Sequence, residues 1–213
     1  MARSRQPVAR SRDLTRRGVS REALRRLVAA GDVERASRGV YLSPSASRSP
    51  HRDLLVVAVR APNAVFCLLT ALAFHHLTTE MPHEVWIALP LKARTPAIDT
   101  PPIRVVRLSE PPLIAGIETH VEHGVPLRVF SPAKTVADCF KFRSKVGIDV
   151  AIAAMRDGWR QKRFTIDELW RFARVCRVAT VMRPYLEALA ADFWRGVPFR
   201  RIAAASFSKA PRL

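Results

Sequence analysis

The chain has 213 residues, 48% of them hydrophobic, which allows one large domain or two small ones with a buried core. Its longest nearly apolar run, residues 64–74, is about half of the roughly 20 residues that a membrane-spanning helix needs, which excludes such a helix. Thirty-six lysines and arginines stand against 18 acidic residues, and the net charge of +18 favours a polyanionic partner such as nucleic acid.

The positive charge is concentrated at the two ends of the chain. Residues 1–38 have a net charge of +7 and residues 131–213 one of +10, whereas residues 39–130 have a net charge of only +1. A protein that is basic throughout would spread this excess evenly. We therefore expect the two ends to meet the polyanion.

Targeting and cysteine usage predict a cytoplasmic protein. No apolar stretch follows the arginine-rich N-terminus, so we expect no secretory signal peptide. Cys67, Cys139 and Cys176 are far apart and form no C-x-x-C pair. This spacing argues against a disulfide framework and a cysteine-based zinc site, and it predicts reduced, buried thiols.

The first elements in chain order predict a helix-turn-helix followed by a hairpin. Gly18 is typical of a helix C-terminus and Ser20 of an N-cap, so they separate two helical segments. The predicted elements are helices over residues 9–17 and 21–30 and strands over residues 33–36 and 40–42. This order is that of a winged helix-turn-helix, with the turn between the strands as the wing.

The helix over residues 21–30 is amphipathic, with apolar side chains on one arc of a helical wheel and three arginines on the opposite arc. A helix fits the major groove of DNA, where arginine pairs with guanine, and arginines of a wing bind phosphates or enter the minor groove. The alternative is an ordinary helical hairpin with a solvated arginine face. The predicted DNA-binding residues are Ser20, Arg21, Arg25, Arg26, Arg35 and Arg38.

Residues 43–50 are rich in serine and proline and predict a linker. Beyond it, short apolar strands separated by proline-rich turns precede a helical region. The expected elements are helices over residues 51–60 and 68–77, strands over 64–67, 84–89, 103–108, 117–121 and 127–130, and helices over 134–142, 149–159, 167–175 and 181–194. They predict an α+β domain with a small, mainly antiparallel sheet and a helical C-terminal end.

These boundaries predict the domain organisation. Residues 1–43 form the winged helix-turn-helix, residues 44–50 the linker, and residues 51–194 an α+β effector domain. Residues 195–213 contain five basic residues and no acidic one, so we expect a mobile basic tail.

No motif argues strongly for a metal site or for kinase chemistry. His75 and His76 lie near His83 and Cys67 in the sequence, but adjacent residues of a helix point in different directions and do not easily share one metal ion. Residues 51–53 (HRD) match part of a kinase catalytic loop, and the other kinase motifs are missing. We therefore expect no metal ion and no cofactor.

A nuclease requires carboxylates that converge on Mg²⁺, often beside a lysine. The candidates are Glu84, Asp99, Glu110 and Glu118 with Lys92. Lys92 lies in a proline-bordered turn and not beside a carboxylate on a strand. The sequence therefore predicts a protein without catalytic residues.

Residues 131–138 (SPAKTVAD) join a predicted strand to a predicted helix. Lys134 and Asp138 are four residues apart, so we expect them to pair on one helix face while apolar neighbours pack. The alternative is a helix N-terminus that receives a phosphate or a partner carboxylate. The structural interpretation is the favoured one.

Four passages, in family order, resemble the AbiEi family of type IV antitoxins that also act as transcriptional repressors. They are residues 18–27 with 38–41 (RGVY), residues 69–75 (LTALAFH), residues 82–90 (PHEVWIALP) and residues 131–140 (SPAKTVADCF). Together they cover most of residues 8–190, and the last passage is the most specific.

The resemblance implies a winged helix that binds operator repeats upstream of its own operon. It also implies a C-terminal domain that serves repression and antitoxin activity, in systems linked to phage defence. The family's usual functional partner is a nucleotidyltransferase-like toxin, which a type IV antitoxin counteracts without requiring a stable complex. Family members usually have a further helix before the one that ends at Gly18. Only residues 1–7 are available for it here, so either the winged helix is abbreviated or the start of the sequence is placed too late.

The basic C-terminal part predicts a second surface for DNA or for a partner protein, with a solvated basic face as the alternative. Its candidate residues are Lys134, Lys141, Arg143, Lys145, Arg160, Lys162 and Arg163. The predicted function is that of an autorepressor and antitoxin. The alternative is a stand-alone regulator without a toxin, and a Mg²⁺-dependent nuclease or an atypical kinase ranks third.

Overall fold

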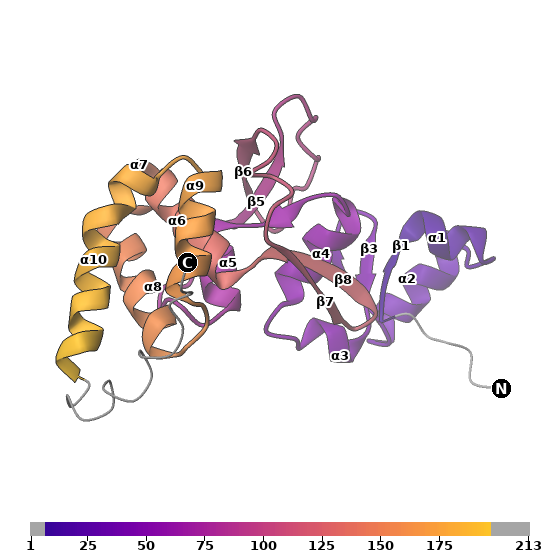
Figure 1. Cartoon of the computed structure of the whole chain (residues 1–213). Coiled ribbons are helices and arrows are strands. Elements are labelled where there is room, and N and C mark those ends of the chain that lie inside the picture. Colours follow the sequence, from indigo (N-terminus) through magenta and orange to yellow (C-terminus); the bar gives the residue numbers. More distant parts are fainter. Residues whose placement is uncertain (1–6, 197–213) are drawn as a thin grey trace, which may run out of the picture.

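The computed structural model describes residues 7–196, which fold as a mixed α+β protein. Figure 1 shows the N-terminal elements at one end of the molecule, a sheet in the middle and a group of helices at the other end. The N-terminal residues 1–6 lie outside the described residues, and so does the predicted tail from residue 197 onward.

The N-terminal part contains β1 (Val8–Arg10), α1 (Ser11–Arg16), α2 (Arg21–Ala29), β2 (Glu34–Ser37) and β3 (Val40–Leu42). Its sheet has the order β1-β3-β2 with antiparallel pairing throughout. The helix predicted over residues 9–17 is wrong at its start, because residues 8–10 form β1. Val8 and Ala9 are buried beside β3, and this tertiary contact outweighs the helical composition. The arrangement is consistent with a winged helix-turn-helix.

The composition of the serine- and proline-rich segment predicts a linker without secondary structure. The structure instead shows a short helix there, α3 (Pro44–Ser47). The Ser43 hydroxyl caps α3 by accepting a hydrogen bond from the Ala46 N–H at 3.3 Å. The Glu34 carboxylate of β2 accepts hydrogen bonds from Ser47 and from the guanidinium of Arg52. These contacts attach the segment to the N-terminal sheet and to the helix that follows.

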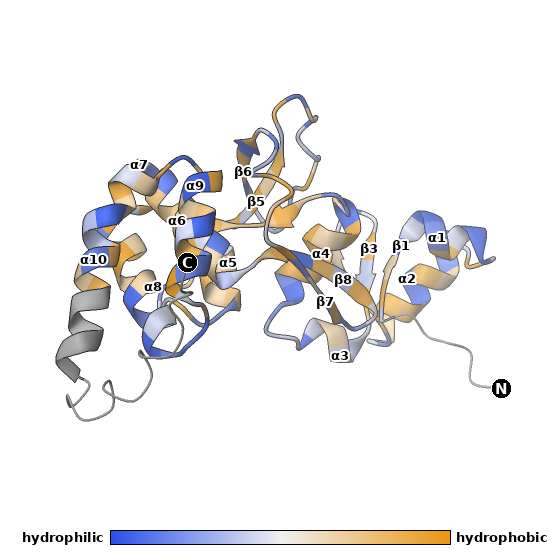
Figure 2. Cartoon of the chain, viewed as in Figure 1, coloured by the Kyte–Doolittle hydropathy of each residue, from blue (hydrophilic) through white to orange (hydrophobic). Residues whose placement is uncertain are grey.

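One hydrophobic cluster extends across this segment. It joins Val40 and Leu42 of β3 and Ala46 of α3 to Leu55 and Val56 of α4 (Arg52–Arg60). Figure 2 shows hydrophobic and hydrophilic residues on α2 and on α4, as expected of amphipathic helices. The domain boundaries stay a prediction, but the two sides of α3 bury apolar surface against each other.

The second sheet has five strands in the order β6-β5-β4-β8-β7. Its strands and the helix that follows β4 are β4 (Val65–Phe66), α5 (Leu68–Phe74), β5 (Val85–Pro90), β6 (Ile103–Leu108), β7 (Ile117–Glu122) and β8 (Val125–Phe130). Two pairings, β5–β6 and β4–β8, are parallel, so the prediction of a mainly antiparallel sheet is wrong. Parallel neighbours need a crossover of about a dozen residues or more, and residues 91–102 provide one between β5 and β6.

The helical end consists of α6 (Pro132–Lys141), α7 (Arg143–Val146), α8 (Ile148–Arg160), α9 (Ile166–Val175) and α10 (Ala179–Gly196). Helix α6 packs against α5, α8 and α9 and is buried along its length. A capping box formed by Thr165 and Glu168 begins α9. In the part of the chain that the structure describes, no helix is long and apolar enough to cross a membrane.

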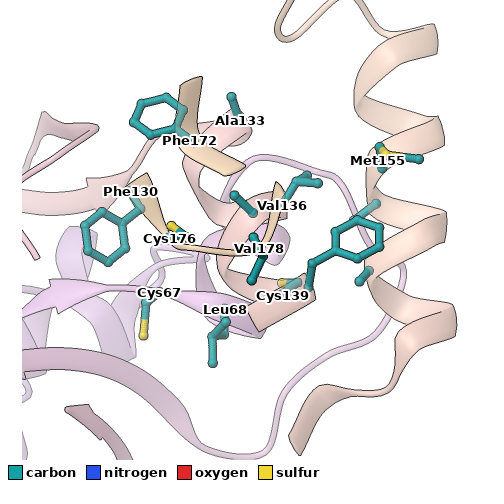
Figure 3. Close-up of a cluster of buried hydrophobic side chains, with 14 of the residues drawn as sticks. Cys67, Leu68, Phe130, Ala133, Val136, Cys139, Met155, Phe172, Cys176 and Val178 are labelled. Carbon is teal, nitrogen blue, oxygen red and sulfur yellow. The ribbon is translucent and has the colours of Figure 1, made fainter. Parts of the chain in front are cut away.

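The three cysteines belong to one hydrophobic cluster between the sheet and the helices. Figure 3 shows Cys67, Cys139 and Cys176 among apolar side chains, and each of them is at most 1% exposed. Burial raises the pKa of all three thiols, and the pKa of Cys176 rises to about 12. The prediction of buried thiols is confirmed.

We expect these thiols to stay unreactive in the folded protein. A thiolate is the reactive form, and the raised pKa values keep the thiols protonated at neutral and mildly alkaline pH. Ellman's reagent at pH 8 is expected to titrate almost no thiol in the native protein and three thiols in guanidinium. Rapid reaction of one thiol without denaturant would contradict this arrangement.

Candidate nucleic-acid interface

Helix α2 is short and capped at its start, and it presents several arginines to solvent. The Ser20 hydroxyl accepts a hydrogen bond from the Ala23 N–H at 3.1 Å, which confirms the predicted N-cap. Leu24 is buried and anchors one face of α2. The solvent-facing side of the helix carries exposed guanidinium groups, namely those of Arg21, Arg25 and Arg26.

These three arginines are available for an external anion. Each is exposed, and none forms an ion pair with another residue in the part of the chain that the structure describes. The face therefore has the charge, the exposure and the helical geometry that a major-groove contact requires.

The turn between β2 and β3 is held in one position. The backbone N–H of Ser11, at the start of α1, donates a hydrogen bond to the Gly39 carbonyl at 2.9 Å. The Arg60 guanidinium of α4 donates to the Arg38 carbonyl at 3.1 Å. The side chains of Arg35 and Arg38 are exposed beside this turn. The predicted wing is thus a fixed basic turn and not a free loop.

Gly39 is needed at this turn because of its backbone conformation and its surroundings. Its φ is +74°, and an added Cβ would lie 3.1 Å from the Ser11 hydroxyl oxygen. We expect Gly39→Ala to lower the free energy of unfolding by about 1–2 kcal/mol, measured by urea denaturation. Gly124→Ala is the matched control, because φ is +76° there and a Cβ would have nothing within 4 Å. An equal loss in both variants would show that the contact with Ser11 contributes nothing.

Further basic side chains surround the wing. Partial burial lowers the pKa of Arg10, the charges of Arg12 and Arg60 lower it further, and Asp13 acts in the opposite direction. Arg12 lies 3.5 Å from Asp13 but remains exposed. Sequence reasoning missed Arg10, Arg12 and Arg60 as neighbours of the wing. Recognition of β1 would have placed the first two there.

Lys134 does not belong to the predicted second surface. Its side chain is 0% exposed, and its ammonium donates a hydrogen bond to Asp138, which is 1% exposed. The ammonium also lies 3.9 Å from the centroid of the Phe130 ring. Lys134 is therefore part of the core. Its pairing with Asp138, four residues further along the helix, is the structural interpretation that the sequence favoured.

The other six residues of that surface form two separate groups. The first group precedes α8 and consists of Lys141, Arg143 and Lys145. The second group lies at or just after the end of α8 and consists of Arg160, Lys162 and Arg163. The 13 residues of α8 separate the groups by about 20 Å along its axis. Lys141 is partly buried and the other five are exposed. Their role in binding stays a prediction, and they cannot act as one compact patch.

No group of three or more histidines, cysteines, aspartates or glutamates in residues 7–196 could hold a metal ion. His75 is buried and donates from Nε2 to the Phe130 carbonyl at 2.8 Å, whereas His76 is exposed. Of the nuclease candidates, Glu84 pairs with Arg104 at 3.5 Å and Glu118 contacts His120 at 3.3 Å.

Comparisons with known proteins bear on the N-terminal part of the chain and on the fold. Residues 1–44 match a family of transcriptional regulators described as AbiEi antitoxin, which confirms the resemblance for the N-terminal part of the chain. The crystal structure of the RV2827C protein from Mycobacterium tuberculosis is similar to this chain, with a TM-score of 0.59 and 17% sequence identity, over 88% of this chain and 77% of that chain. At this identity the likeness concerns the fold alone. No curated protein matches the chain.

Proposed function

We propose that the protein is a DNA-binding transcriptional regulator that reads its operator with α2 and holds the flanking phosphates with the wing. The observation that carries this proposal is the set of exposed arginines Arg21, Arg25 and Arg26 on one face of α2, without ion-pair partners among the described residues. The match of residues 1–44 to a regulator family supports the same conclusion. The protein needs no catalytic residue or cofactor for this function.

The operator, in this proposal, lies upstream of the protein's own operon, and the protein also acts as the antitoxin of a type IV system against a nucleotidyltransferase-like toxin. A stand-alone regulator would use the same interface. The two functions differ in a growth assay: an antitoxin restores growth to cells that express the neighbouring nucleotidyltransferase-like protein, and a stand-alone regulator does not.

The experiment that tests DNA reading is fluorescence anisotropy with the protein's own upstream DNA and a scrambled duplex of equal length, titrated across salt concentrations. We expect affinity for the native duplex to exceed that for the scrambled one by at least about 10³-fold. Equal affinity for both duplexes, with a steep dependence on salt, would mean that charge alone drives binding. The proposed operator reading would then be wrong.

A further inference from the structure

The segment between β5 and β6 lies beside the wing, although about 55 residues separate the two in sequence. One guanidinium joins them: Arg60 donates to the Arg38 carbonyl of the wing at 3.1 Å and also to the carbonyl of Ala97. Residues 91–99 of this segment are named the crossover loop below. The crossover loop and the wing are therefore neighbours on the surface.

The crossover loop is held to the sheet at several points. The Arg107 guanidinium of β6 donates to the carbonyls of Pro90, at 3.1 Å, and Ala93, and to the Thr95 hydroxyl at 2.8 Å. The side chain of Ile98 packs against the hydrophobic cluster that extends to β3. These contacts fix the backbone of the loop and give its exposed side chains a defined place beside the wing.

The charges of the crossover loop match those of the wing. Lys92 and Arg94 are exposed and form no ion pair with other residues in the described part of the chain, and Asp99 is the one acidic residue of the loop. Arg107 and Arg60 are occupied by the loop backbone and act as anchors. The loop thus offers two exposed cations on a segment whose backbone is joined to the wing through Arg60.

We propose that the crossover loop is a second DNA-contacting element, in which Lys92 and Arg94 bind backbone phosphates beyond those reached by the wing. The inference rests on the proposed function, because it assumes that α2 and the wing dock on DNA. Lysine and arginine on such a loop meet phosphates rather than base edges, so they add affinity without sequence preference.

The test is the double variant Lys92→Ala/Arg94→Ala in the full chain, with the same two duplexes and salt titration. Because each phosphate contact contributes about −0.9 to the slope of log K against log salt, we expect the slope to become shallower by roughly 1.8. The affinities for the native and scrambled duplexes should fall by the same factor, so their ratio stays unchanged. In hydroxyl-radical footprinting, the DNA bound by this variant is expected to lose protection at one edge of the footprint only.

The matched control is Arg156→Ala/Arg174→Ala, which removes two exposed arginines from α8 and α9, in the helical part of the molecule. An unchanged slope in the loop variant, or an equal change in the control, would overturn the proposal. A failure of the proposed operator reading can be told apart from a failure of the loop proposal. In that case the wild type prefers neither duplex, while a slope change confined to the loop variant still identifies the loop as a phosphate contact.

Discussion

Replacing Asp138 by alanine is expected to lower the free energy of unfolding by about 3–5 kcal/mol. The substitution leaves the Lys134 ammonium without its carboxylate at a position where the lysine side chain is 0% exposed. It also removes the acceptor of a hydrogen bond from the Cys176 thiol at 3.2 Å. The measurement is urea denaturation followed by circular dichroism, with the slope of the transition checked for two-state behaviour.

The double variant Lys134→Met/Asp138→Val separates the charge effect from the packing effect. It removes both charges and keeps apolar volume in the core, so we expect it to lose much less stability than Asp138→Ala. A loss below about 1 kcal/mol for Asp138→Ala would mean that the pair is solvated, and Lys134 would then return to the list of surface residues.

Replacing Arg25 or Arg26 by alanine is expected to reduce the preference for the native operator over a scrambled duplex by about 1–3 kcal/mol per residue, which is roughly 5- to 150-fold. Both side chains are exposed on α2, whereas Leu24 is the residue that anchors the helix. Because both arginines are exposed and alanine favours helix, the fold should be retained. Competition anisotropy with the two duplexes measures the preference directly.

The control for this prediction is Arg38→Ala on the wing. Loss of a wing phosphate contact lowers affinity for both duplexes alike, so the ratio of the two affinities in this variant should stay close to that of the wild type. If Arg25→Ala also lowers both affinities equally, α2 binds phosphates only and does not read bases.

Local features of the sequence were sufficient for much of the fold. Ser20 marks the start of α2 because a serine hydroxyl satisfies a free backbone N–H, and the apolar spacing identifies the buried face of that helix. The strand predicted over residues 103–108 has those same bounds in the structure. In each case the signal lies within a few residues of the element that it predicts.

Local sequence patterns were enough to predict the α+β class, the order of most elements and the arginine face of α2. The tertiary structure alone decided that residues 8–10 form a strand, that half of the pairings in the second sheet are parallel, that Lys134 is buried and that the crossover loop lies beside the wing. These features depend on contacts between segments far apart in the chain. Composition and periodicity report local preference, whereas burial against a distant strand or a hydrogen bond from Arg60 depends on where the whole chain brings its parts together.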